Sequence, residues 1–140
     1  MSHRRVVNIE MPFTKDYVFL ARRAVRELAR SLSFTKCQLD EITLAVGEAC
    51  TNAVKHGCCS KTYSSIRLKC ILRPHEICIL ISNPRDSSAP LMIPVEPDTE
   101  KENGYGLFIM NNLMDRVRIR HTSHHATVMM TKIVRHNVLD

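Results

Sequence analysis

The order of the segments with apolar periodicity restricts the fold of this chain more than any other feature. A short strand over residues 4–11 ends at Pro12, and two amphipathic helices follow, over about 14–33 and 35–57. The pattern then predicts two strand pairs separated by one helix: 65–72 with 77–82, a helix over 107–114, and 116–121 with 126–135. Helices grouped in sequence and strands joined by hairpins predict an α/β two-layer sandwich, with helices on one face of an antiparallel or mixed sheet.

The length of the chain predicts one domain over residues 1–140. It has 140 residues, with no repeat and no obvious linker. No apolar run approaches the roughly 20 residues that cross a membrane, and the first residues lack the apolar core of a signal peptide. We therefore expect a cytoplasmic protein.

The six cysteines are interpreted as reduced thiols. Four of them fall in apolar segments, where Cys packs as a small core residue: Cys37, Cys50, Cys70 and Cys78. Cys58 and Cys59 follow His56, but no second Cys/His pair stands at zinc spacing. The pattern favours structural thiols over a metal site.

The net charge of +6 suits an acidic or phosphorylated partner or a nucleic acid. Four arginines recur at helical spacing, on the face away from the apolar stripe of the first helix: Arg22, Arg23, Arg26 and Arg30. Aromatic residues do not alternate with them, so a platform for stacked bases is not predicted. The charge alone identifies no partner, because many basic domains bind none of these specifically.

The second helix carries the most informative polar residues. Glu48 and Asn52 are four residues apart and share one helical face, and Lys55 lies near that face. A carboxylate, an amide oxygen and a cation suit a nucleotide with Mg²⁺, which prefers oxygen ligands and takes few from protein. From this spacing alone, a solvated polar face remains the more common explanation.

Two further segments suit a phosphate ligand. Gly104 and Gly106 form a turn before the third helix, where backbone can approach a phosphate beside a helix N-terminus. Residues 84–103 contain four prolines without clear periodicity, which is typical of a functional lid or of a disordered segment. Each signal is weak by itself.

Taken together in this order, the segments resemble a known family. Residues 48–57 (EACTNAVKHG) resemble the N-box of the GHKL ATPases, which have the Bergerat fold, and more narrowly the bacterial anti-sigma-factor serine kinases of the RsbW/SpoIIAB type. Residues 104–110 (GYGLFIM) with Leu113-Met114-Asp115 resemble the second glycine box and its continuation. Ala126-Thr127-Val128 is similar to the strand that closes the nucleotide pocket.

The resemblance implies the residue roles. Glu48 would be the general base and Asn52 the Mg²⁺ ligand. The ATP-binding residues it implies are Asn52, Lys55, Asn83, Gly104, Gly106, Leu107 and Thr127, with Thr127 near the adenine and residues 84–103 as the lid. Asn83-Pro84-Arg85 departs from the family's first glycine box, because Asn83 replaces an aspartate and both glycines are missing. An Asn can still accept from the adenine amine, through a weaker neutral hydrogen bond.

Two functions from different classes follow. The first is a kinase that transfers the γ-phosphoryl of ATP to a serine of a STAS-type anti-sigma-factor antagonist and also sequesters a sigma factor. The resemblance implies a homodimer, and the first helix is a candidate partner surface; no direct nucleic-acid or membrane contact is expected. The alternative is a domain that sequesters its partner without nucleotide, which the altered first box favours and the retained Glu48 and Asn52 oppose. A sensor histidine kinase domain is more distant, because no phosphorylatable histidine on a dimerisation helix is visible.

Overall fold

The computed structural model describes residues 4–12, 14–56, 65–84, 103–121 and 125–135. Its elements follow the predicted order: β1 (Arg5–Pro12), the 3₁₀ turn η1 (Lys15–Tyr17), α1 (Val18–Ala29), α2 (Lys36–His56), β2 (Ser65–Arg73), β3 (Glu76–Pro84), α3 (Asn103–Leu113), β4 (Arg116–His121) and β5 (His125–Ile133). No helix in these ranges is long and apolar enough to cross a membrane.

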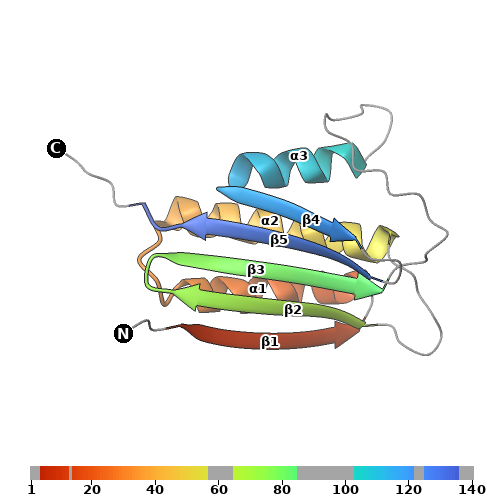
Figure 1. The fold of residues 1–140 in the computed structure, drawn as a ribbon, viewed down its shortest axis with the longest axis horizontal. Coiled ribbons are helices and arrows are strands. Elements are labelled where there is room, and N and C mark those ends of the chain that lie inside the picture. Colours follow the sequence, from red (N-terminus) through yellow and green to blue (C-terminus); the bar gives the residue numbers. More distant parts are fainter. Residues whose placement is uncertain (1–3, 13, 57–64, 85–102, 122–124, 136–140) are drawn as a thin grey trace.

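The five strands form one sheet in the order β1-β2-β3-β5-β4 (Figure 1). All four described pairings are antiparallel. Residues on β2 alternate strictly between buried and more exposed, and β3 follows in register, so that Cys70 lies opposite Ile79. Because successive side chains of a strand point to opposite faces, this alternation defines a helix side and an outer side of the sheet.

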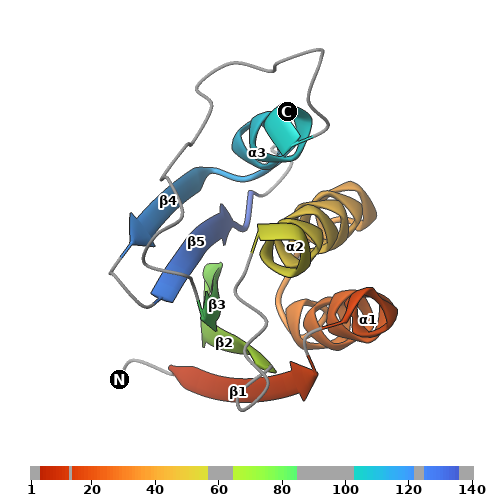
Figure 2. The same ribbon diagram turned by 90° about the vertical axis from the view of Figure 1, so that its right-hand side faces the viewer.

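All three helices pack on the same face of the sheet, which is why we call it the helix side (Figure 2). The core between the layers consists mostly of aliphatic side chains and methionines, including Val25, Ile42, Leu68, Ile79 and Met130. These five are at most 1% exposed. The two-layer sandwich and its helices on one face, predicted from the sequence, are confirmed.

The helix starts are determined locally. At α2, the Gln38 N–H donates to Thr35 Oγ1 (3.1 Å) while the Thr35 N–H donates to Gln38 Oε1 (3.0 Å), a reciprocal capping box. Thr14 precedes the first helical segment with extended backbone, but its side chain makes no cap hydrogen bond. That segment begins as a 3₁₀ turn, and α1 ends at Ala29, four residues before the predicted end.

Three of the cysteines are buried as predicted, and one is not. Cys50 and Cys70 pack in the core, where burial raises the pKa of Cys50 to about 12 and of Cys70 to about 11, and Cys78 is 7% exposed on the outer side of the sheet. Cys37 is exposed, because it stands in the first turn of α2 beside Gln38, away from the buried stripe of that helix. Cys58 and Cys59 lie outside the described residues, and no described cluster of His, Cys, Asp and Glu suits a metal ion.

Candidate active site at the end of helix α2

Four chain segments meet at one end of the sandwich. The C-terminal end of α2, the end of β3, the start of β5 and the start of α3 all lie at the right-hand end of Figure 1, which faces the viewer in Figure 2. Each segment carries a residue that the sequence marks as a nucleotide ligand: Asn52 on α2, Asn83 on β3, Thr127 on β5 and Gly104 on α3.

Glu48 and Asn52 stand in the C-terminal half of α2, on the approach to this end. One stripe of the helix is fully buried and includes Ala45, Ala49 and Ala53. Glu48 and Asn52 lie beside that stripe and are half-buried. No hydrogen bond or ion pair joins either side chain to another residue in the described ranges. A carboxylate and an amide one helical turn apart are therefore available to a ligand.

Asn83 reaches the helix side of the sheet. It is the second-last residue of β3, is 7% exposed, and pairs with Ala126 of β5. Ile79 and Ile81, its neighbours at two-residue steps, are both core residues. The strand alternation therefore directs Asn83 toward the helices, at the same end of the molecule as Asn52.

Thr127 points the other way. Its register partner is Ser82, and the two hydroxyl oxygens are 3.0 Å apart. Since Ser82 and Asn83 are adjacent on one strand, their side chains lie on opposite faces of the sheet. The structure does not bring Thr127 together with Asn83, and the side chain opposite Asn83 is the methyl of Ala126.

Gly104 and Gly106 lie inside the first turn of α3, which begins at Asn103, four residues earlier than predicted. The described glycines have no positive φ, so these two do not serve a left-handed turn. The first four N–H groups of a helix have no partner within it, and here they belong to residues that include both glycines. The side chains of Lys55 and Leu107, and the predicted lid apart from its two end residues, lie outside the described part of the chain.

Arg22 is a neighbour of the site that the sequence pattern does not reveal. A Cβ atom on Gly47 would lie 2.8 Å from Arg22 Cδ, so the arginine crosses α2 where that helix has no side chain. This half-buried cation lies next to the turn that carries Glu48. Burial dominates the raised pKa of Cys50, and Arg22 acts in the opposite direction. The sequence signal that could have revealed this contact is Gly47. A glycine inside a helix costs about 1 kcal/mol relative to alanine, so its presence there indicates a packing requirement.

Buried charges fix α3 against α2 and the sheet. The Lys132 ammonium, on a residue only 6% exposed, donates to the Leu113 carbonyl at the end of α3 and lies 3.5 Å from Glu41 Oε2 on α2. Asp115, just after α3, accepts from the Ile133 N–H at 2.7 Å. These bonds hold the C-terminal end of α3 against α2 and the sheet.

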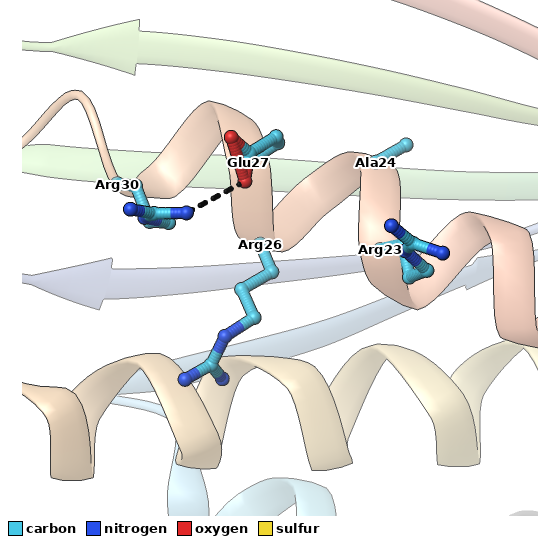
Figure 3. Close-up of a pocket in the computed structure, with 5 residues that line it drawn as sticks. All are labelled: Arg23, Ala24, Arg26, Glu27 and Arg30. Atoms are coloured by element: carbon cyan, nitrogen blue, oxygen red, sulfur yellow. Dashed lines mark hydrogen bonds and ion pairs between the residues drawn. The ribbon is translucent and has the colours of Figure 1, made fainter.

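The arginines of α1 do not form one exposed face. Arg26 leaves α1 for α2 (Figure 3), where it bonds Asp40 (2.9 Å) and Thr43 (3.1 Å), and Arg22 packs over Gly47. Only two arginines remain on the outer surface of α1. Arg30 pairs with Glu27 at 3.1 Å, and Arg23 lies over the Phe19 ring. A shallow depression on this helix is lined by Arg23, Ala24, Arg26, Glu27 and Arg30.

Comparison with known proteins agrees with this geometry. Residues 11–132 match the histidine kinase-like ATPase domain. The chain is 27% identical to the serine-protein kinase RsbW of Bacillus cereus (strain AH820), over 96% of this chain and 88% of the relative. It is also 27% identical to the serine-protein kinase RsbW of Bacillus subtilis (strain 168), over 90% and 84%.

A solved structure of the RsbU and RsbW domains of Rv1364c from Mycobacterium tuberculosis has the same fold. Its TM-score is 0.70 at 18% identity, and the match covers 94% of this chain and 33% of that one. The chain therefore belongs to the histidine kinase-like ATPase domain family and, within it, is similar over nearly its whole length to RsbW serine-protein kinases.

Proposed function

We propose that this protein is an ATP-dependent protein serine kinase that acts as an anti-sigma factor. Its substrate would be a serine of a STAS-type antagonist, and its second partner a sigma factor that it sequesters. Family membership and the similarity to RsbW kinases support this activity class. The observation that carries the proposal is the pair Glu48 and Asn52 in the C-terminal half of α2, half-buried and without partners among the described residues.

The donor set fits a nucleotide with Mg²⁺. Asn52 offers an amide oxygen to a cation that prefers oxygen ligands, and Glu48 offers a carboxylate one helical turn away as the proton acceptor. Bound Mg²⁺ would neutralise charge on the phosphates. The N–H groups at the start of α3 suit phosphate oxygens, and Asn83 suits the adenine amine, which it would recognise through its amide.

In the proposed reaction, Glu48 accepts the proton of the substrate serine. The serine oxygen then forms a bond to the γ-phosphorus, while the bond from that phosphorus to the β,γ-bridging oxygen breaks and ADP leaves. General-base assistance of this kind contributes about 10²–10⁴-fold to a rate. Thr127 is left out of the ligand set, since it lies on the outer face of the sheet.

We propose that partner switching follows from this activity, in a homodimer that binds its partners partly through α1. Phosphorylated antagonist would dissociate and leave the kinase free to hold the sigma factor. The outer surface of α1 supports this use, because Phe19 and Leu20 are 54% and 52% exposed next to Arg23. Exposed aromatic and arginine side chains are enriched where proteins bind each other.

Calorimetric titration with ATP, with and without Mg²⁺, tests the proposal. We expect Asn52→Ala to remove the Mg²⁺-dependent part of the affinity, and Asn8→Ala, an exposed site on β1, to leave it unchanged. Glu48→Gln should still bind ATP but lose about 10²–10⁴-fold in transfer of labelled γ-phosphate to a STAS-type antagonist. Glu10→Gln, also exposed on β1, is its matched control.

Two outcomes would contradict the proposal. Wild-type protein that binds no ATP up to millimolar concentration would favour the alternative function, a domain that sequesters its partner without nucleotide. The Pro84-Arg85 sequence after Asn83, in place of glycines, is the feature that favours this alternative. Transfer at the normal rate by Glu48→Gln would exclude Glu48 as the general base.

A further inference from the structure

The outer face of the sheet is a second surface with its own chemistry. All three helices pack on the opposite face, and no described helix or strand covers this one (Figure 2). The register and the strand alternation identify the side chains that reach it. They are the residues that face away from the buried rows of Cys70, Ile79 and Met130.

An apolar strip crosses this face from β2 over β3 to β5. Leu80 on β3 pairs with Met129 on β5, and Cys78 on β3 pairs with Ile71 on β2. Three of these four side chains are half-buried and Cys78 is 7% exposed, although no helix lies over them. We call these four residues the apolar strip.

Cations lie at both ends of the apolar strip. On this face β2 presents Arg67 and Lys69, and β4 presents Arg116, Arg118 and Arg120, all of them exposed. No ion pair joins any of these five to a described carboxylate. Since β3 and β5 lie between β2 and β4, the two groups of cations are three strand spacings apart, or about 14 Å.

We propose that this outer face is a docking surface for an acidic amphipathic helix of a partner protein. A helix is about 10–12 Å wide with its side chains, so it fits between the two groups of cations. Its apolar stripe would lie on Leu80 and Met129, and its acidic flanks would reach the unpaired cations of β2 and β4. Charge complementarity of this kind gives specificity and a faster association.

Two other occupants fit less well. A second copy of this chain, paired through the same face, would bring five cations of one copy against five of the other. Single-stranded nucleic acid binds through aromatic side chains that stack on bases, and the five strands contain no Phe, Tyr or Trp. The inference rests on the sheet alone and does not depend on the proposed kinase activity.

A designed peptide provides the probe. It is a fluorescent helix of about 18 residues, with Leu at positions a and d of each heptad and Glu on both flanks. We expect micromolar binding at about 0.15 M salt. The double variant Lys69→Glu/Arg118→Glu should weaken that binding by at least about tenfold. Lys15→Glu/Lys36→Glu changes the net charge equally at exposed sites elsewhere and should not.

Three further measurements test the apolar stripe, nucleic acid and a second copy of the chain in turn. A peptide of the same composition in scrambled order should bind at least about tenfold more weakly, because it lacks the apolar stripe. Absence of binding by the designed peptide, or equal binding of the scrambled one, would overturn the proposal. Tighter binding of a single-stranded oligonucleotide would assign the face to nucleic acid. Self-association that the double variant abolishes, measured by sedimentation, would assign it to a second copy.

Discussion

Replacing Asp115 should destabilise the protein more than its position in a surface turn suggests. Its carboxylate accepts from the Ile133 N–H at 2.7 Å and pairs with Arg135, and its side chain is only 14% exposed. A hydrogen bond to a charged group contributes about 1.5–3 kcal/mol. The ion pair adds about 0–1 kcal/mol, because Arg135 is 69% exposed. We expect Asp115→Ala to cost about 2–3 kcal/mol, or about 6–10 °C in Tm for a chain of this length.

The same residue makes part of the stability depend on pH. Partial burial alone would raise the pKa of Asp115. The Ile133 N–H and the Arg135 guanidinium outweigh that effect, so its pKa lies below the usual range. The contribution of Asp115 is therefore fully present above the unfolded pKa, about 3.9. It is lost as the pH falls through the lower folded pKa.

Urea unfolding followed by circular dichroism at pH 7 and at acid pH measures both effects, since the chain has no Trp for fluorescence. Asp115→Asn keeps an acceptor for the Ile133 N–H and should cost less than Asp115→Ala. Arg135→Ala should cost less than about 1 kcal/mol. If Asp115→Ala costs no more than Arg135→Ala, the Ile133 hydrogen bond does not contribute about 1.5–3 kcal/mol. If the gap in unfolding free energy between wild type and Asp115→Asn stays constant as the pH falls toward 3, folding does not lower the pKa of Asp115.

Three further predictions concern separate parts of the chain. Thr35→Ala removes the capping hydroxyl of α2 and should cost about 1 kcal/mol in urea unfolding; an unchanged midpoint would mean that the cap is replaced by water. At pH 8, Cys37 should be alkylated at least about 100-fold faster than Cys50 or Cys70, because burial raises the pKa values of those two thiols to about 12 and 11. Peptide mapping by mass spectrometry measures the three rates, and equal rates would contradict the burial of Cys50 and Cys70. Asn83→Asp should tighten ATP binding in calorimetry by making the hydrogen bond to the adenine charge-assisted, and no change would place Asn83 away from the base.

The fold was predictable because its signals are local. Thr35 and Gln38 mark the start of α2 within four residues, and the turn between β2 and β3 carries Pro74. The same holds for the pair Glu48 and Asn52, whose shared face follows from helical periodicity alone. For such features, no knowledge of the tertiary structure was needed.

The differences between prediction and structure have another cause, because each depends on packing between elements. The sequence assigns all four arginines of α1 to one solvated face, whereas Arg22 and Arg26 cross to α2, where Gly47 leaves space and Asp40 offers a partner. Likewise, the pattern that marks Thr127 does not tell which face of the sheet it occupies. Only the pairing of Ser82 with Thr127 decides that, and this pairing joins residues 45 positions apart.

The period-two alternation of strands gives this sheet two chemically separate surfaces. Ser82 and Asn83 are adjacent, yet Asn83 belongs to the helix side and Ser82 to the outer side, and Ala126 and Thr127 divide in the same way. One strand end therefore presents one residue to the proposed nucleotide site and the next to the outer face. Substitution of an exposed side chain on the outer face leaves the buried rows intact, so the two surfaces can vary independently. Only a change in strand register would alter both at once, because a shift of one residue exchanges the faces of every side chain.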